Sequence, residues 1–221
     1  MAKVFLSPSN QYDNVYAYGN TTEGVQCGKI ADACKIALER SGVDVMLMHD
    51  ESMQEKCAAS NAFDADLHVP IHTNAFNGKV MGTRLFCYSA DGKGMEACKA
   101  IYARLAPITP GDSENIQVNA DYYEVRVPAA PTAYIECEFH DTVEGAKWIV
   151  ENTVLIGETI ARGICDYFGV TFKEPEQPKP AAPASGKLYR VQVGAFSVRE
   201  NAERMLARLK AAGFDGYIRE W

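Results

Sequence analysis

The 221-residue chain lacks any uninterrupted apolar run of roughly 18 residues, the length that a membrane-spanning helix needs. Its first ten residues, MAKVFLSPSN, also lack the long apolar stretch of a secretory signal, so we expect synthesis in the cytoplasm without export by that route. The seven cysteines form no CxxC pair and are odd in number, which argues against a disulfide framework and against a cysteine zinc site. We therefore expect reduced, mostly buried thiols.

Positive charge is scarce in the main part of the chain. The formal net charge is -7, but residues 186–221 hold seven basic and four acidic residues, and residues 173–185 balance to zero. The first 172 residues consequently carry -10. Because an acidic surface repels the phosphate backbone, we expect no nucleic acid partner.

Proline marks a division of the chain. The segment KEPEQPKPAAPAS, residues 173–185, holds four of the ten prolines and no large apolar side chain, which is the composition of a stiff, solvated linker. We predict a domain over residues 1–172, this linker, and a small module over residues 186–221.

Short apolar runs alternate with helical periodicities before the linker. The expected strands are 3–7, 43–48, 66–72, 83–88 and 133–138, and the expected helices are 22–41, 52–62, 94–105 and two segments within 143–168. This alternation predicts an α/β fold: a mostly parallel sheet of about six strands with helices on both faces, plus a small C-terminal βαβ module. Ligands bind such sheets at the carboxyl ends of the strands.

Two of the four histidines lie in one strand candidate, DLHVPIHTNAF. His68 and His72 share a face but lie about 13 Å apart at about 3.3 Å per residue, so they cannot both bind one ion. His72 is at the carboxyl end of the strand and is a candidate ligand, with a hydrogen-bonded structural role as the alternative. We expect His68 to be structural.

Carboxylates are expected at the same edge of the sheet. Glu23 lies in the first turn of the first helix, on its core-facing stripe, and its alternative role is to interact with the helix dipole. Glu136 and Glu138 lie on one face of the strand AYIECE, where unpaired burial of charge is costly. An imidazole, one carboxylate ligand and a second carboxylate as base are the parts of a zinc hydrolase.

Three segments resemble the zinc-dependent N-acetylmuramoyl-L-alanine amidases of the "amidase 3" type. IHTNA is similar to the segment whose histidine binds zinc, which implies that role for His72. TTEGVQCGKIADACKIALERSG is similar to the first helix, which implies Glu23 as a ligand, and PTAYIECEFHD is similar to the segment that supplies the catalytic base, here Glu136. The likeness runs from about residue 3 to 169.

The chain departs from this family at the first zinc ligand. The usual strand followed by D-x-G-H-G is LSPSNQ here, and Asn10 takes the place of the histidine. Asparagine is a poor zinc ligand. Either Asn10 or a substitute such as His140 completes the site, or the site binds metal weakly and has low activity. Glu138, in place of the usual glycine, adds another acid.

The resemblance implies a peptidoglycan hydrolase, an autolysin or prophage endolysin, that uses Zn²⁺ to cleave the amide between N-acetylmuramic acid and L-alanine. Arg126 and Asn74 are the predicted substrate-binding residues, although a surface salt bridge is the commoner role of such an arginine. The alternative is a non-catalytic peptidoglycan-binding protein that has lost one ligand. Without a signal, we expect action on the wall after the membrane barrier fails.

The tail resembles half of a SPOR domain, a module that binds peptidoglycan glycans. LYRVQVGAFSVRENAERMLARLKAAGFDGYI contains one βαβ repeat of the two in a full module. Gln192 and Phe196, with Tyr189 and Tyr217, are the predicted glycan contacts, and ordinary packing roles are the alternative. Because one repeat can bury little surface, we expect pairing, either as a homodimer of tails or against the catalytic domain.

Overall fold

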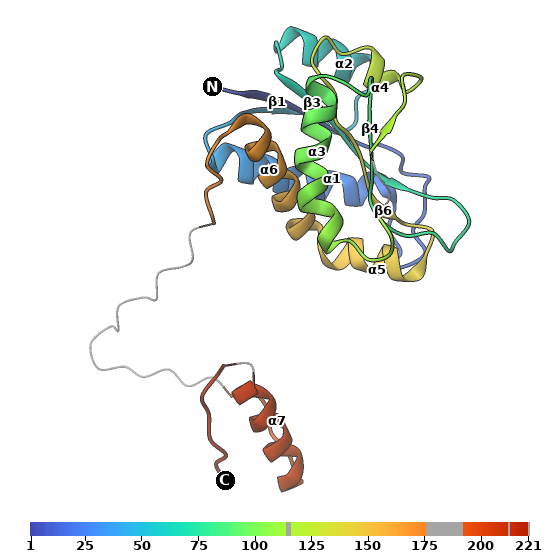
Figure 1. Ribbon diagram of the computed structural model, residues 1–221. Helices are drawn as coiled ribbons and strands as arrows, with labels where there is room; N and C mark the ends of the chain where they lie inside the picture. The colour runs from blue at the N-terminus through green and yellow to red at the C-terminus, as the bar shows by residue number, and fades with distance from the viewer. Residues whose placement is uncertain (114–115, 176–191, 212, 221) are drawn as a thin grey trace. The chain divides into compact units, whose positions relative to one another are not determined.

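The computed structural model describes residues 1–113, 116–175, 192–211 and 213–220 (Figure 1). The chain divides into two compact units, Met1–Pro175 and Glu176–Trp221. Along the described residues, no helix is both long and apolar enough to cross a membrane.

The first unit is built on a six-stranded sheet in the order β2-β1-β3-β6-β4-β5. Its strands are β1 (Lys3–Pro8), β2 (Asp44–Leu47), β3 (Leu67–Asn74), β4 (Arg84–Cys87), β5 (Gln117–Val118) and β6 (Tyr134–Phe139). All strand pairs are parallel except β4 with β6, which are antiparallel. The predicted α/β fold with a mostly parallel sheet is therefore confirmed.

The helices of this unit are α1 (Glu23–Arg40), α2 (Met53–Ala62), α3 (Lys93–Leu105), α4 (Tyr123–Arg126), α5 (Val143–Glu151) and α6 (Thr153–Phe168), with a 3₁₀ turn at Ala106–Ile108. Two helix ends have the capping residues that the sequence predicts. Ser52 and Glu55 form the capping box of α2, and Gly169 ends α6 at a φ of 65°, a conformation that favours glycine. The short α4 and β5 were not predicted, because neither is long enough to show a period.

One face of the sheet holds the main apolar core. Alternate residues of β3, Leu67, Val69 and Ile71, are fully buried in a core to which α1, α3 and α6 also contribute, and Figure 1 shows α3 beside α6. All seven cysteines are buried and free, as predicted.

The opposite face of the sheet is polar along β3 and is covered near its start by α2 and α4. The Glu124 carboxylate of α4 accepts a 2.5 Å hydrogen bond from Ser7 and lies 3.3 Å from His68 Nε2, and His68 stacks on Phe5. His68 therefore has the structural surroundings expected of it. The remainder of this face, toward the carboxyl end of β3, carries His72.

In the second unit, the predicted helix is present as α7 (Arg199–Ala211). The predicted flanking strands are not: residues 192–196 and 213–220 have no strand assignment, and the rest of the first predicted strand lies outside the described residues. A strand needs a neighbour for its backbone groups, and a single short repeat supplies few apolar contacts to hold one.

Gly157 permits the close approach of α6 to α1. A Cβ at this position would lie 2.4 Å from the Ile30 carbonyl oxygen and 2.8 Å from the Cys34 nitrogen, which are backbone atoms that cannot move aside. In a free helix, alanine is more stabilising than glycine by about 0.5–1 kcal/mol. Here we expect Gly157→Ala to lower the free energy of unfolding by about 1–3 kcal/mol through overpacking.

Urea denaturation of the full chain measures this change. Val154→Ala, at a side chain on the same helix that is 64% exposed, is the matched control and should change stability by less than about 0.5 kcal/mol. Equal stability of Gly157→Ala and wild type would contradict the close packing.

Candidate active site

The centre of the site is a pair of buried side chains from two elements far apart in the sequence. Glu23, in the first turn of α1, has its Oε1 3.0 Å from Nδ1 of His72, near the end of β3. Burial disfavours the carboxylate, but hydrogen bonds from His72 and Asn14 outweigh it and lower the pKa of Glu23. The structure thus brings together two of the three residues predicted from sequence.

The imidazole of His72 is held by a stacking contact on its ring and by a hydrogen bond at Nδ1. Its ring stacks on Tyr134, with centroids 4.7 Å apart and an interplanar angle of 20°. Burial alone would lower its pKa, yet the hydrogen bond to Glu23 and the charge of Glu136 raise the pKa of His72 above its ordinary value. A ring fixed in this way presents one nitrogen in a defined direction.

Glu136 lies directly across from His72 in the paired register of β3 and β6. Burial raises the pKa of Glu136 to about 7, with the charge of Glu23 adding to the effect and His72 and Arg84 opposing it. Within the described residues, its buried Oε2 has no hydrogen-bond partner. A carboxylate poised near neutral pH with a free oxygen is suited to accept and return a proton.

Glu138 has a different role, which the sequence did not reveal. Its carboxylate accepts hydrogen bonds from the backbone nitrogens of Gly82, at 2.8 Å, and of Phe139, at 2.6 Å. It thereby anchors the end of the loop that connects β3 to β4. Burial raises the pKa of Glu138 to about 7 although these N–H groups favour the charged form.

The two side chains predicted as the third ligand, Asn10 and His140, hydrogen-bond to other residues than His72 and Glu23. The Asn10 amide nitrogen donates to the carbonyl oxygens of Asp50 and Glu51, at 3.4 and 3.1 Å. His140 Nδ1 lies 3.0 Å from the Thr73 hydroxyl, the ring stacks on Tyr16, and burial lowers its pKa. Among the described residues, neither side chain hydrogen-bonds to His72 or Glu23.

Gln11, which sequence reasoning passed over, contacts both members of the pair. Its Nε2 lies 3.3 Å from Glu23 Oε1 and 3.4 Å from His72 Nδ1. Asn14, also missed, donates to Glu23 Oε2 at 2.7 Å. The only indication of these contacts in the sequence was that Gln11 and Asn14 both lie in the loop that follows β1.

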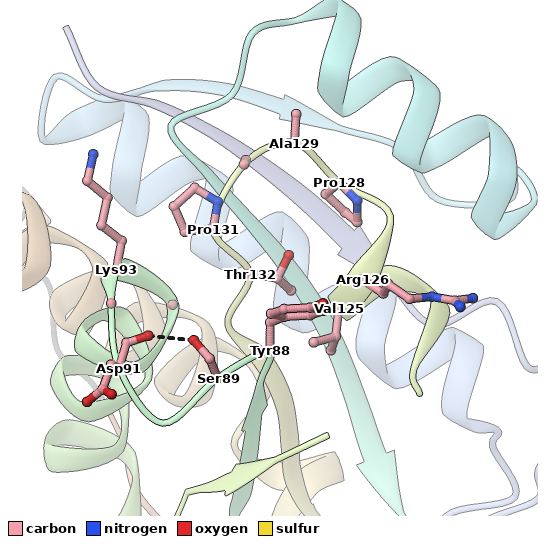
Figure 2. A pocket seen from close by; sticks show the side chains of 13 residues that line it. Tyr88, Ser89, Asp91, Lys93, Val125, Arg126, Pro128, Ala129, Pro131 and Thr132 are labelled. Carbon is pink, nitrogen blue, oxygen red and sulfur yellow. Dashed lines mark hydrogen bonds between the residues drawn. The ribbon is translucent and has the colours of Figure 1, made fainter. Parts of the chain in front are cut away.

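The two predicted substrate-binding residues lie at different places. Asn74 ends β3, and its Oδ1 accepts from the backbone nitrogen of Ala75. Arg126 ends α4, is exposed, and lines a cavity of about 380 Å³ with Tyr88, Ser89 and Thr132, among others. Figure 2 shows its guanidinium pointing away from Ser89 and Thr132, and none of Glu23, His72 or Glu136 lines this cavity.

A second group of potential metal ligands occurs among the described residues. Atoms of Cys57, His68 and Glu124 all lie within 4.8 Å of one another, and all three residues are buried. This group includes neither Glu23 nor His72. The Glu124 carboxylate in it already accepts from Ser7 and contacts His68, so we interpret the group as a buried polar network that anchors α4.

The main site brings together an imidazole and two buried carboxylates, which are the side-chain types that metal-assisted hydrolysis uses and which indicate a hydrolase. The comparisons define the family. A model described as N-acetylmuramoyl-L-alanine amidase matches residues 11–166, and a SPOR domain model matches residues 178–220. The chain therefore belongs to the N-acetylmuramoyl-L-alanine amidase family.

Two relatives are similar along nearly the whole chain. The sporulation-specific N-acetylmuramoyl-L-alanine amidase of Bacillus subtilis (strain 168) is 25% identical over 99% of this chain and 84% of its own length. The N-acetylmuramoyl-L-alanine amidase CwlM of Bacillus licheniformis is 24% identical over 99% of this chain and 85% of its own length.

Solved structures show the same fold for the first unit. The catalytic domain of the amidase CwlV from Bacillus (Paenibacillus) polymyxa var. colistinus aligns with a TM-score of 0.70 at 16% identity. The alignment covers 77% of this chain and 100% of that domain.

The raised pKa of Glu138 predicts a pH-dependent stability. Its pKa is 4.5 in an unperturbed chain and about 7 when folded, so folding takes up a proton between these values, and the contribution of Glu138 to stability is lost as the pH rises through about 7. We expect Glu138→Gln, which stays neutral, to become progressively more stable relative to wild type as the pH is raised from about 4.5 to about 8.

Urea denaturation of the metal-free full chain at several pH values measures the difference. Glu96→Gln, on the exposed surface of α3, is the control and should stay at a constant difference from wild type. A pH-independent difference for Glu138→Gln would show that the folded pKa is not raised.

Proposed function

We propose that this chain hydrolyses the amide bond between N-acetylmuramic acid and L-alanine in peptidoglycan, with a divalent metal ion held by His72 and Glu23 and with Glu136 as the general base. The observation that carries the proposal is the placement of Glu136, which is buried, has a pKa of about 7 and faces His72 across paired strands. Membership of the amidase family supports the choice of bond.

The residues present fit a metal ion such as Zn²⁺. An imidazole nitrogen and a carboxylate oxygen 3.0 Å apart are of the donor types that zinc takes. Asn14 donates to the outer oxygen of Glu23, an orienting contact of the kind that supports metal ligands. When bound, the ion would polarise the amide carbonyl and make a water molecule easier to deprotonate.

Glu136 moves the protons of the reaction. Its carboxylate accepts a proton from the attacking water, whose oxygen forms a bond to the lactyl carbonyl carbon. The carbon–nitrogen bond then breaks, and the protonated Glu136 gives its proton to the departing amine of L-alanine. Its place across from His72 and an Oε2 atom without a hydrogen-bond partner among the described residues make both transfers accessible to one group.

Glu136→Gln tests this assignment, because the amide has nearly the same shape but cannot take up a proton. We expect it to bind metal like wild type and to lose at least about 100-fold in rate, measured as new L-alanine amino termini released from purified cell walls. His72→Ala should lose both metal and activity.

The control is Glu144→Gln, on an exposed carboxylate of α5, which should release amino termini at the wild-type rate. Wild-type activity of Glu136→Gln would remove this residue from the mechanism. If metal-supplied wild-type protein retains no ion and releases no termini, the non-catalytic wall-binding protein is the correct alternative.

We further propose that residues 186–221 bind glycan strands of peptidoglycan, since the SPOR match covers this module. The side chains of Phe196 and Tyr217 are 43% and 71% exposed, so both rings are accessible to a sugar. Gln192 is also exposed, with its amide nitrogen 3.4 Å from the Gly194 carbonyl oxygen. Tyr189 lies outside the described residues.

A chain that ends at Pro175 tests the role of the tail. We expect it to keep its activity on short soluble wall fragments but to be retained less by insoluble walls, measured by co-sedimentation with purified peptidoglycan. Phe196→Ala and Tyr217→Ala together should reproduce part of the loss, and equal retention of all versions would contradict glycan binding.

The homodimer through the tail stays a prediction. Sedimentation of the full chain beside the chain ending at Pro175 decides it, because only the full chain should associate. Two monomers would show that the single repeat functions without a second copy.

A further inference from the structure

The amide nitrogen of Gln11 lies close to three polar atoms of the site. It is 3.3 Å from the Ser9 hydroxyl, 3.3 Å from Glu23 Oε1 and 3.4 Å from His72 Nδ1. These distances are long for hydrogen bonds, and Nδ1 of His72 can accept one only after it loses the proton that it donates to Glu23. When that proton is absent, Nδ1 of His72 and Oε1 of Glu23 both present lone pairs beside Gln11, which makes a suitable environment for a cation.

We propose that Gln11 supplies the third protein ligand of the metal site, through its amide oxygen, and that the resulting set of one nitrogen and two oxygen donors binds zinc weakly and also accepts manganese. The inference rests on the proposed function, because it concerns the same ion.

The backbone holds Gln11 in register with the other two ligands. Its carbonyl oxygen accepts from the nitrogen of Gly24, in the first turn of α1, at 3.1 Å, and the Asn14 carbonyl accepts from the nitrogen of Glu23 at 2.9 Å. On the other side, the Ser9 nitrogen donates to the carbonyl of Ile71, next to His72, at 2.9 Å. The loop is thus tied to both elements that supply ligands.

Asn10, the residue next to Gln11, is directed elsewhere. Its amide nitrogen donates to two carbonyl oxygens in the segment that follows β2. Consecutive side chains after a strand leave the backbone in different directions, so the sequence position equivalent to the family histidine does not decide which side chain reaches the ion. This neighbour is therefore a matched control.

Binding an ion requires the Gln11 amide to turn so that its oxygen, not its nitrogen, faces His72 and Glu23. In the present arrangement that oxygen accepts from Asn14 at 3.0 Å. After the turn, Asn14 can still donate to Glu23 Oε2, and water can replace Gln11 because Gln11 is exposed. The turn gives up the hydrogen bond from Asn14 and the long contacts of Nε2 with Ser9 and Glu23, and it leaves the backbone hydrogen bonds of the loop unchanged.

The donor set determines which ions are preferred. Imidazole ligands suit zinc, whereas carboxylate and carbonyl oxygens suit manganese and magnesium. Replacing an imidazole by a neutral amide oxygen removes a strong zinc donor and leaves His72 as the only nitrogen ligand of the three. Selectivity for zinc over manganese should therefore be smaller than in a site with two histidines.

The experiment measures metal affinity directly. Metal-free wild type, Gln11→Ala, Gln11→His and Asn10→Ala, all as full chains, are titrated with Zn²⁺ in competition with a chromogenic chelator and with Mn²⁺ by electron paramagnetic resonance. Loss of an outer-shell partner alone costs about 10- to 100-fold in affinity, so we expect Gln11→Ala to bind both ions at least about tenfold more weakly. Gln11→His should bind zinc at least about tenfold more tightly and gain selectivity over manganese.

Asn10→Ala should match wild type. If Asn10→Ala weakens binding while Gln11→Ala does not, the assignment is wrong and Asn10 is the ligand. If wild type binds no ion, or Gln11→Ala binds zinc more tightly, Gln11 blocks the site and the inference is overturned. Release of L-alanine amino termini by the same samples tests the proposed function separately. If wild type is active but Gln11→Ala binds metal as tightly as wild type does, Gln11 is not a ligand and the proposed function still holds.

Discussion

The contact between His72 and Glu23 connects the catalytic chemistry to the fold. It joins the start of α1 to the end of β3, two elements whose other faces build the main apolar core. A buried carboxylate is costly unless it is hydrogen-bonded, and here the imidazole, Asn14 and Gln11 provide that compensation. The packing of α1 against the sheet thereby sets the position of one ligand relative to the other.

The sequence predicted well those features that repeat. Leu67, Val69 and Ile71 alternate with polar residues, and this period identified β3 and placed His72 on the polar face. The same reasoning placed Glu136 beside it, because parallel neighbours end at one edge of a sheet. Which strand pairs with which was not predicted, since β6 lies between β3 and β4 in the sheet and only the register reveals it.

Features that depend on loops could not be predicted in the same way. The contacts of Gln11 and Asn10 follow from the path of the chain after β1, where no periodicity constrains the side chains. Comparison with a family motif pointed to Asn10, whereas the side chain beside His72 is Gln11. Glu138 is a similar case. Its partners are backbone nitrogens, one of which belongs to a loop distant in the sequence, and no residue type identifies such a backbone partner.

The alternation along β3 also couples the stability of the chain to its chemistry. Ile71 and His72 are consecutive, so a slip of one residue in the pairing of this strand would place the imidazole in the apolar layer and the isoleucine in the polar site. A chain with that error would lose core packing and chemistry together. A register error in β3 would therefore lower the stability of the chain as well as its activity.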